Sequence, residues 1–274
     1  MQKKSYVNVL FIGISISLTL FGAGFQGYNY WFNHQNKIRS SKSFLISGIY
    51  QTGPQKEAIS TTKLAELLGL SVDHPTHILD FSESLAEKKL REFPLFKSVK
   101  IQKKKPSHIL IDYTIREPLL VVKDYPDSVI DSEGVIFPYR QFFTQKLIPE
   151  CHFGLIDEEH FEEKKKLCLE VYKIADAFLK PLAFKILRLD VSNAFLESYS
   201  KKEIILTIEQ ESSSLSFPYY LRMNTIEIEK QFSNFLVLSK ELQKQQKLWT
   251  KLGQSKSPKP KVIDLRLDGM ALID

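Results

Sequence analysis

A run of residues near the N-terminus, 7–25, contains no charged side chain and constrains the chain more than any other feature. It reads VNVLFIGISISLTLFGAGF, and the nearest charges are Lys4 and Lys37. A helix of this length is roughly 28 Å long, about the thickness of the hydrocarbon core of a bilayer. Because backbone groups in lipid must be hydrogen-bonded internally, we expect a transmembrane helix over residues 6–26.

A cleaved signal peptide is the alternative interpretation of this run. Such peptides have a shorter apolar region, and Gly22 and Gly24 make a poor cleavage site. A retained anchor fits better, because Tyr28, Tyr30 and Trp31 follow it and would form an aromatic belt at the membrane interface. The sequence therefore favours an anchor that contacts the lipid bilayer through residues 7–25.

The positive charge of the chain lies mostly in front of its first acidic residue, Glu57. The formal net charge is +6, and the six basic residues before Glu57 account for it, because 38 − 6 leaves 32 basic against 32 acidic residues. The remainder has no net charge, so its charge does not indicate that the chain binds nucleic acid. The basic stretch Lys103–Ser107 has no interleaved aromatic side chains, so we interpret it as a solvated hairpin tip.

The membrane orientation is not fixed by charge counts. Lys3 and Lys4 precede the apolar run, and Lys37, Arg39 and Lys42 follow it. A cytoplasmic tail of only residues 1–5 before a large C-terminal part favours an N-terminus in the cytoplasm.

Residues 27–42 are expected to be a polar juxtamembrane linker, and a strand, two helices and two strands follow it. The helices are expected after Ser60 and Ser82, which are suitable N-caps, and Gly69 and Pro94 mark their ends. Two alternating apolar runs flank the Lys103–Ser107 turn. The later segments have the patterns of a turn at Asp131–Gly134, helices over 162–179 and 226–249, and strands over 184–191, 203–209 and 262–274. The fold class is therefore α+β.

The order strand, helix, helix, strand, strand resembles a POTRA module. The motif REP (Arg116–Pro118), then VIDSEGVIFP at 129–138 and VIDLRLDGMALID at the C-terminus, extend the resemblance to the bacterial FtsQ/DivIB division proteins. Leu267 stands where that family usually has tyrosine. The resemblance implies a POTRA domain over 43–118 and an FtsQ-type β domain over 119–274, with a mostly antiparallel sheet and flanking helices.

The same resemblance implies a non-enzymatic, single-pass inner-membrane scaffold of the division septum, with its bulk in the periplasm. In the family, the terminal strand receives a segment of FtsB, which arrives with FtsL, and the POTRA domain contacts other divisome proteins. Independently, apolar residues in a terminal edge strand suit pairing with a partner strand; an ordinary strand paired on both sides is equally compatible with the residues. The implied binding residues are Arg266, Leu267, Asp268, Gly269, Met270, Ala271, Leu272, Ile273, Lys201 and Lys202.

The sequence offers little catalytic or metal-binding chemistry, and no cofactor is expected. His74 and His77 lack an obvious third ligand, and Cys151 and Cys168 are expected to be two buried free thiols. Two other functions remain as alternatives. One is a POTRA-containing export or outer-membrane assembly factor, and the other is an exported hydrolase that uses His152 with the acids near it.

Overall fold

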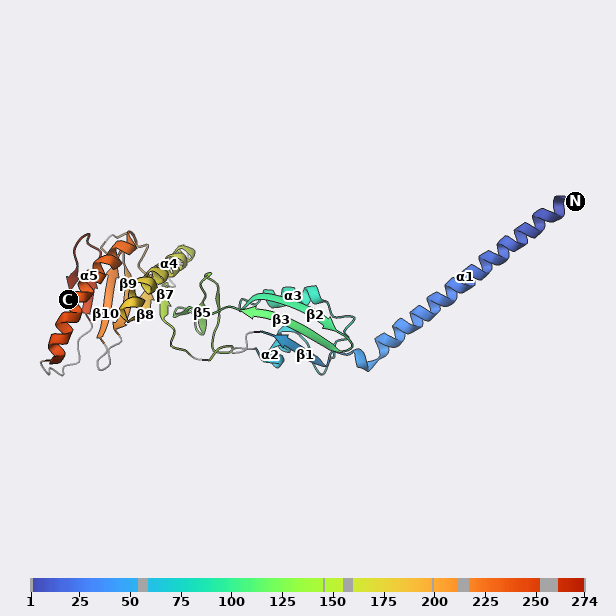
Figure 1. Cartoon of the computed structure of the whole chain (residues 1–274), viewed down its shortest axis with the longest axis horizontal. Helices are drawn as coiled ribbons and strands as arrows, with labels where there is room; N and C mark the ends of the chain where they lie inside the picture. The colour runs from blue at the N-terminus through green and yellow to red at the C-terminus, as the bar shows by residue number, and fades with distance from the viewer. Residues whose placement is uncertain are drawn as a thin grey trace. The chain divides into compact units, whose positions relative to one another are not determined.

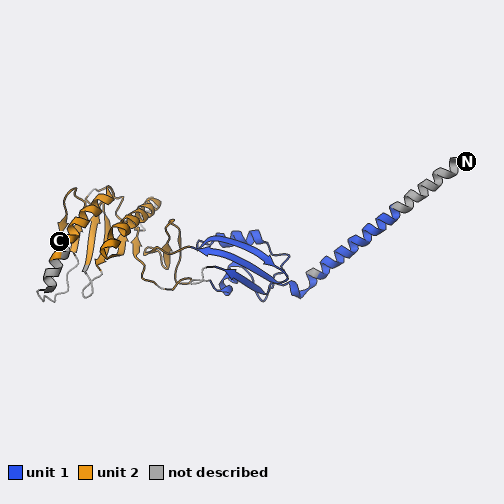
Figure 2. Ribbon diagram, viewed as in Figure 1, with its two compact units in different colours: residues 1–115 blue, residues 116–274 orange. Residues whose placement is uncertain are grey.

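The computed structural model describes the backbone of residues 2–53, 59–144, 146–154, 160–198, 200–210, 217–251 and 261–273. Within these ranges, side chains are described except at residues 2–16, 38, 217, 242, 243 and 245–251. The chain divides into two compact units, residues 1–115 and 116–274 (Figure 2). Each unit has its own sheet.

Unit 1 begins with helix α1 (Gln2–Ser40), which continues through most of the segment expected to be a linker. Residues 28–40 contain no glycine or proline that would end the helix, so this segment is helical, and its role as a linker stays a prediction. Over the part of the chain whose side chains are described, no helix is both long enough and apolar enough to cross a membrane. Residues 7–16 of the expected span lie outside that part, and the anchor stays a prediction.

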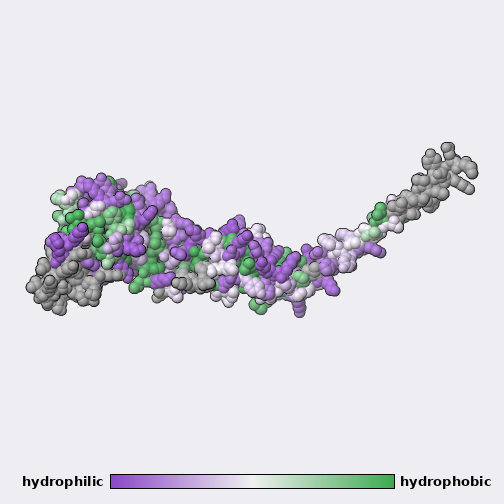
Figure 3. Space-filling view, in the orientation of Figure 1, coloured by the Kyte–Doolittle hydropathy of each residue, from purple (hydrophilic) through white to green (hydrophobic). Residues whose placement is uncertain are grey.

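The described portion of α1 changes from apolar to basic along its length. Large apolar side chains from Leu18 to Phe32 are exposed, and the last turn carries Lys37 and Arg39. Figure 3 shows the same change, from hydrophobic residues in the middle of the helix to hydrophilic ones near its C-terminal end.

The sheet of unit 1 has three strands in the order β1-β3-β2. β1 (Gly48–Thr52) is parallel to β3 (His108–Ile115), and β2 (Phe96–Lys104) forms an antiparallel hairpin with β3 (Figure 1). Helices α2 (Thr61–Leu68) and α3 (Glu83–Arg91) lie between β1 and β2 in the chain, in the expected order. A turn at 105–107 closes the β2–β3 hairpin in the expected stretch, although Lys103 and Lys104 are the last residues of β2 and not part of the turn.

Local signals at the helix ends are confirmed. The Ser60 and Ser82 side chains accept hydrogen bonds from the backbone N–H groups of the first turns of α2 and α3, and Gly69 is left-handed, with φ of 74°. The apolar residues Phe81, Leu85 and Leu90 recur near helical spacing, but Leu85 is 68% exposed, whereas Phe81 and Leu90 are buried. Ala86, next to Leu85, is also buried, so the buried stripe of α3 includes Ala86 in place of Leu85.

The outer edge of β2 is covered by side chains of α3. Glu87 accepts a hydrogen bond from the backbone N–H of Ile101 at 2.8 Å, and Arg91 donates to the carbonyl of Val99 at 2.9 Å. The N–H of Lys103 donates in the same way to a carboxylate oxygen on the first turn of α3. Because these backbone groups are already hydrogen-bonded to side chains of α3, this edge of β2 is not available to pair with another strand.

Unit 2 contains a sheet with the strand order β12-β11-β10-β9-β8-β7-β4-β5-β6. Its strands are β4 (Leu120–Val122), β5 (Ser128–Ile130), β6 (Ile136–Pro138), β7 (Glu150–His152), β8 (Phe184–Asp190), β9 (Ile204–Gln210), β10 (Phe217–Met223), β11 (Lys261–Asp264) and β12 (Leu272–Ile273). The pairs β4/β7, β7/β8 and β10/β11 are parallel and the others antiparallel, so the sheet is mixed. Two of the parallel pairs follow from helical crossovers, since α4 joins β7 to β8 and α5 joins β10 to β11.

Helices α4 (Phe161–Leu179) and α5 (Ile228–Lys251) pack on one face of this sheet (Figure 1). A single apolar cluster joins them to alternate strand residues, among them Cys168, Val171, Phe232, Phe235, Leu189, Leu206 and Leu221, all at most 1% exposed. The opposite face carries polar side chains around β7 and β8, with Glu150 ion-paired to Lys123 and Arg188. On that same face, Val129 and Phe137 of the β5–β6 hairpin are buried, so the main core lies on the helical side and a small apolar group lies opposite it.

The two motifs near the start of unit 2 meet in space. Arg116 forms ion pairs with Asp131 at 2.7 Å and Glu133 at 2.6 Å. Asp131 also accepts hydrogen bonds from the N–H groups of Glu133 and Val135, which closes the β5–β6 turn around Gly134, with φ of 83°. The REP arginine therefore fixes the hairpin that follows it.

Candidate partner-binding edge

The C-terminal segment forms two short strands joined by a turn, and the expected continuous strand over 262–274 was wrong. β11 ends at Asp264, and the N–H of Met270 donates to the carbonyl of Leu267 at 3.3 Å within the turn. Gly269 has φ of 69°, in the left-handed region that glycine adopts without steric cost. The chain therefore reverses direction and returns as β12.

The return places β12, and not β11, at the outside of the sheet. β11 is flanked by β10 on one side and by β12 on the other, where Asp264 and Ile263 are paired with Leu272 and Ile273. Among the described residues, no strand lies on the far side of β12. The open edge expected over 264–273 is thus confined to Leu272 and Ile273.

Apolar side chains of the terminal segment are exposed around this edge. Leu267 is 44% exposed, Met270 59%, Leu272 58% and Ile273 47%. Ala271 packs against the core cluster and holds the segment down. We call Leu267, Met270, Leu272 and Ile273 the terminal apolar edge.

A network of charged side chains lies behind the terminal apolar edge. Arg222 bonds to Glu203 at 2.6 Å and to Asp264 at 3.4 Å, while Arg266 bonds to Asp264 at 2.7 Å. Burial alone would raise the pKa of Asp264, but the hydrogen bonds from Arg266, with the nearby charges of both arginines, lower it. Asp264 is therefore held as a carboxylate between two guanidinium groups.

Arg266 also connects the terminal segment to the loop before β9. Its guanidinium donates to the carbonyl of Ser200 at 2.9 Å, and Lys201 and Lys202 follow directly. Lys201 is exposed and Lys202 half-buried. The two groups of residues implied by the sequence, far apart in the chain, thus lie at the same side of the sheet.

The predicted binding residues have different roles in this arrangement. Arg266 is bonded to Asp264 and to the carbonyl of Ser200 and so positions the segment, and Gly269 makes the turn. Asp268, on the exposed turn, forms an ion pair with Lys230 at 2.7 Å, which lowers the pKa of Asp268 and raises that of Lys230 through their mutual hydrogen bond. Only the terminal apolar edge and Lys201 present accessible side chains without a described ion pair.

Sequence reasoning missed the residues that hold the segment from other elements. Glu203, Arg222 and Lys230 supply the charges, and Asn224 donates from its amide to the carbonyl of Arg266 at 3.2 Å. Their positions in the sequence give no signal, apart from the outward register of Arg222 in an alternating strand.

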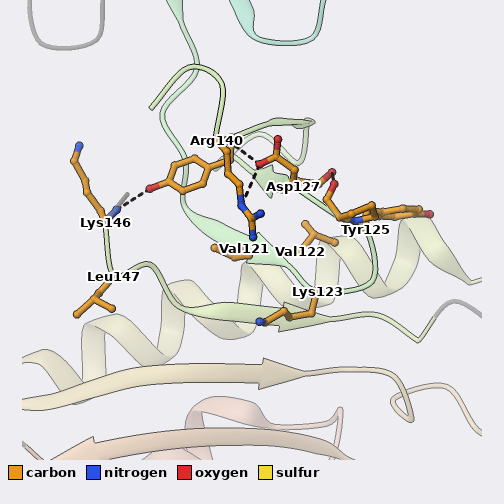
Figure 4. Close-up of a pocket in the computed structure, with 11 residues that line it drawn as sticks. Val121, Val122, Lys123, Tyr125, Asp127, Arg140, Lys146 and Leu147 are labelled. Atoms are coloured by element: carbon orange, nitrogen blue, oxygen red, sulfur yellow. Dashed lines mark hydrogen bonds and ion pairs between the residues drawn. The ribbon is translucent and has the colours of Figure 1, made fainter. Parts of the chain in front are cut away.

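The opposite edge of the sheet, β6, is protected differently. β6 has three residues and ends at Pro138, which has no N–H to offer another strand. Beside β4 and β5 lies an open hollow of about 450 Å³, shown in Figure 4. Arg140 approaches Asp127 there, and Lys123 reaches the hollow from below but is bonded to Glu150. Among the described residues that line the hollow, Lys123, Asp127 and Arg140 form ion pairs within the chain.

Other candidate residues are explained structurally. His77 stacks on Phe44 and accepts a hydrogen bond from the N–H of Leu79. The Nε2 atom of His152 is buried without a hydrogen-bond partner, and the acids expected beside it, 157–159, lie outside the described residues. Within the described ranges, no group of three or more His, Cys, Asp or Glu side chains could hold a metal ion.

Comparison with known proteins adds no assignment. No protein-family model matches the chain, and no curated protein matches its sequence.

Proposed function

We propose that this protein is a membrane-anchored division scaffold of the FtsQ/DivIB type. Its terminal apolar edge would capture a strand of an FtsB-like protein, in complex with an FtsL-like one. Residues 7–25 would hold it in the inner membrane with the N-terminus in the cytoplasm. The two units would lie in the periplasm, enriched at the septum, and unit 1, as a POTRA domain, would contact other divisome proteins.

The contrast between sheet edges is the observation that carries this proposal. The β2 edge is covered by Glu87 and Arg91, and β6 ends in Pro138. β12 has no such protection among the described residues and is surrounded by exposed apolar side chains. Soluble domains usually protect such edges, and an added strand would both complete the hydrogen bonding and cover the apolar surface.

The charge around β12 suits an acidic segment of the partner. Lys201 is exposed beside the terminal segment, whereas the nearby carboxylates of Glu203 and Asp264 are already paired with arginines. Such rim charges would mainly accelerate association and make it sensitive to salt.

Site-specific photocrosslinking in dividing cells tests the proposal. A photoreactive amino acid at Met270 or Leu272 should crosslink to an FtsB-like or FtsL-like protein. The matched control is Leu147, which is 89% exposed in unit 2 but distant in sequence and strand order from β12. Equal crosslinking from Leu147, or none from Leu272 in cells that divide, would contradict strand capture.

A pair of substitutions separates binding from folding. Leu272→Asp should abolish co-purification of the partner and mid-cell enrichment, while the free energy of unfolding changes by less than about 0.5 kcal/mol, as for most surface substitutions. Leu147→Asp should leave both unchanged. Uniform envelope localisation of the unmodified chain would favour the export alternative.

A further inference from the structure

The sheet of unit 1 is buried on one face only. Alternate strand residues such as Ile101, Ile109 and Ile111 are at most 3% exposed and lie on the helical side. The residues between them point the other way, and most of these are exposed among the described residues. We define the Tyr50 face as the following residues of this open side: Tyr50, Lys100, Gln102, Lys104, His108 and Leu110.

Tyr50 is 57% exposed, yet its ring is held in place by neighbouring side chains. It stacks on the imidazole ring of His108, with the ring centroids 4.9 Å apart. Gly48 makes room for this stack, because a Cβ at that position would lie 2.7 Å from Cδ2 of His108. The Nδ1 atom of His108 is in turn hydrogen-bonded to Oγ of Ser107 at 3.2 Å. A large aromatic ring is thus presented to solvent with little freedom left to lose on binding, as in the anchor residues of protein interfaces.

Leu110 occupies the centre of the Tyr50 face and is only partly exposed. The strand register pairs it with Tyr50 on β1 and with Gln102 on β2. Lys100 and Lys104 lie on either side of Gln102 along β2, each two residues or roughly 7 Å away. An apolar centre therefore has an aromatic ring on one side and two cations on the other.

The charge of this face is positive and largely uncompensated. Lys100 and Lys104 are exposed, and neither forms an ion pair with another residue in the described part of the chain. Asp112 is the only acidic residue of β1, β2 and β3, and its carboxylate already accepts a hydrogen bond from the hydroxyl of Thr52 at 2.7 Å. A partner of negative charge is therefore complementary to the face.

We propose that the Tyr50 face binds an acidic peptide segment that carries an apolar or aromatic side chain. That side chain would pack on Leu110 and the ring of Tyr50, and the acidic side chains would approach Lys100 and Lys104. The source of the segment, another division protein, rests on the proposed function, whereas its chemistry depends only on the face. A peptide is favoured over an anionic lipid surface because Leu110 is less exposed than Tyr50 and Gln102, so a single side chain reaches it more readily than a flat layer of headgroups.

Fluorescence anisotropy of a labelled peptide tests the proposal on the full chain, held in nanodiscs of phosphatidylcholine. The probe is Glu-Glu-Glu-Phe-Glu-Glu-Glu, and Gln-Gln-Gln-Phe-Gln-Gln-Gln is its uncharged control. We expect saturable binding of the acidic probe that weakens several-fold between about 50 mM and about 300 mM NaCl, because salt screens exposed charges. Absence of binding by the unmodified chain, or equal binding of the uncharged control, would overturn the proposal.

Matched variants locate the binding on the molecule. Lys100→Gln/Lys104→Gln and Tyr50→Thr should each raise the dissociation constant of the acidic probe about tenfold. Lys88→Gln/Lys89→Gln removes the same charge from exposed positions on α3 and should change it by less than about twofold, as expected for charges remote from the bound peptide. An unchanged urea midpoint confirms that each variant is folded. Equal weakening by both lysine pairs, or unchanged binding by Tyr50→Thr, would contradict binding at this face.

Anionic lipid is tested separately by co-sedimentation of the same nanodiscs with phosphatidylglycerol vesicles. We expect no difference between the two lysine variants in this assay. Co-sedimentation that is lost in Lys100→Gln/Lys104→Gln and kept in Lys88→Gln/Lys89→Gln would overturn the peptide and assign the face to lipid headgroups.

Failure of this proposal can be told apart from failure of the proposed function. Absence of peptide binding, with crosslinks from Met270 and Leu272 to the division partner intact, would overturn only the role of the Tyr50 face. Peptide binding at the Tyr50 face, with uniform envelope localisation of the chain, would support the face and overturn the division scaffold.

Discussion

Arg266 donates a hydrogen bond to the carbonyl of Ser200 at 2.9 Å, and this contact joins the C-terminal segment to a loop 66 residues earlier. The same guanidinium bonds to Asp264 at 2.7 Å. An arginine that was expected to contact a partner is thus bonded within the chain and supports the surface that we propose for binding. Its role is to position the segment that carries the terminal apolar edge.

Replacement of Arg266 should therefore weaken capture indirectly. In Arg266→Met, Asp264 loses its closest partner, and we expect a cost of about 1–3 kcal/mol in the free energy of unfolding, measured in urea. Partner affinity should fall about tenfold because the edge is less ordered. Arg140→Met, which removes an arginine that is 74% exposed just after β6, the strand at the opposite edge of the sheet, is the control. Full partner binding by a destabilised Arg266→Met would show that the bonds of Arg266 to Asp264 and Ser200 are not needed for capture.

The turn at Gly269 offers a test of backbone conformation alone. Its φ is 69°, and nothing lies within 4 Å of the position that a Cβ would take. Gly269→Ala should thus cost about 1–2 kcal/mol through strain and weaken capture, whereas Gly269→Asn should be tolerated better, because asparagine visits this region more readily. Titration calorimetry with the purified partner complex measures the difference. Equal binding by both variants would indicate that the turn does not fix the edge.

The covered edge of unit 1 predicts a different defect. Glu87→Ala should leave the N–H of Ile101 without its side-chain partner and lower the free energy of unfolding by about 1–2 kcal/mol. The exposed β2 edge should also promote self-association, which sedimentation velocity detects. Glu92→Ala, an exposed glutamate at the end of the same helix, should have neither effect. A monomeric Glu87→Ala of normal stability would contradict this role for Glu87.

Acid should loosen the terminal segment before the core unfolds. The pKa of Asp264 and that of Asp268 are both lowered from the ordinary value of 3.8. A carboxyl whose pKa is lowered by folding contributes stability above its unfolded pKa, and this contribution is lost as pH falls through the folded pKa. Amide hydrogen exchange of residues 264–273, corrected for the intrinsic rate, should increase below about pH 3.8 relative to that of β9. Unchanged protection at pH 2–3 would show that the ion pairs do not hold the segment.

Much of the fold could be predicted because its signals are local. Ser60, Ser82 and Gly69 mark helix ends through contacts within one turn, and the turn at 105–107 separates two alternating patterns. Within α3, Leu85 fits the apolar spacing yet is exposed, because a hydrophobic stripe of that width does not specify which residue is buried.

The sequence by itself determined the uncharged N-terminal run, the order of helices and strands from β1 to β3, and the residue types at the C-terminus. Each of these follows from composition or from periodicity within one segment. Only the tertiary structure decided that the chain turns back at Gly269, that Arg266 reaches Ser200, and that Arg116 meets Asp131. These contacts join residues that are distant in the chain. They arise when helices and strands pack, and no local pattern records which distant partner a side chain will meet.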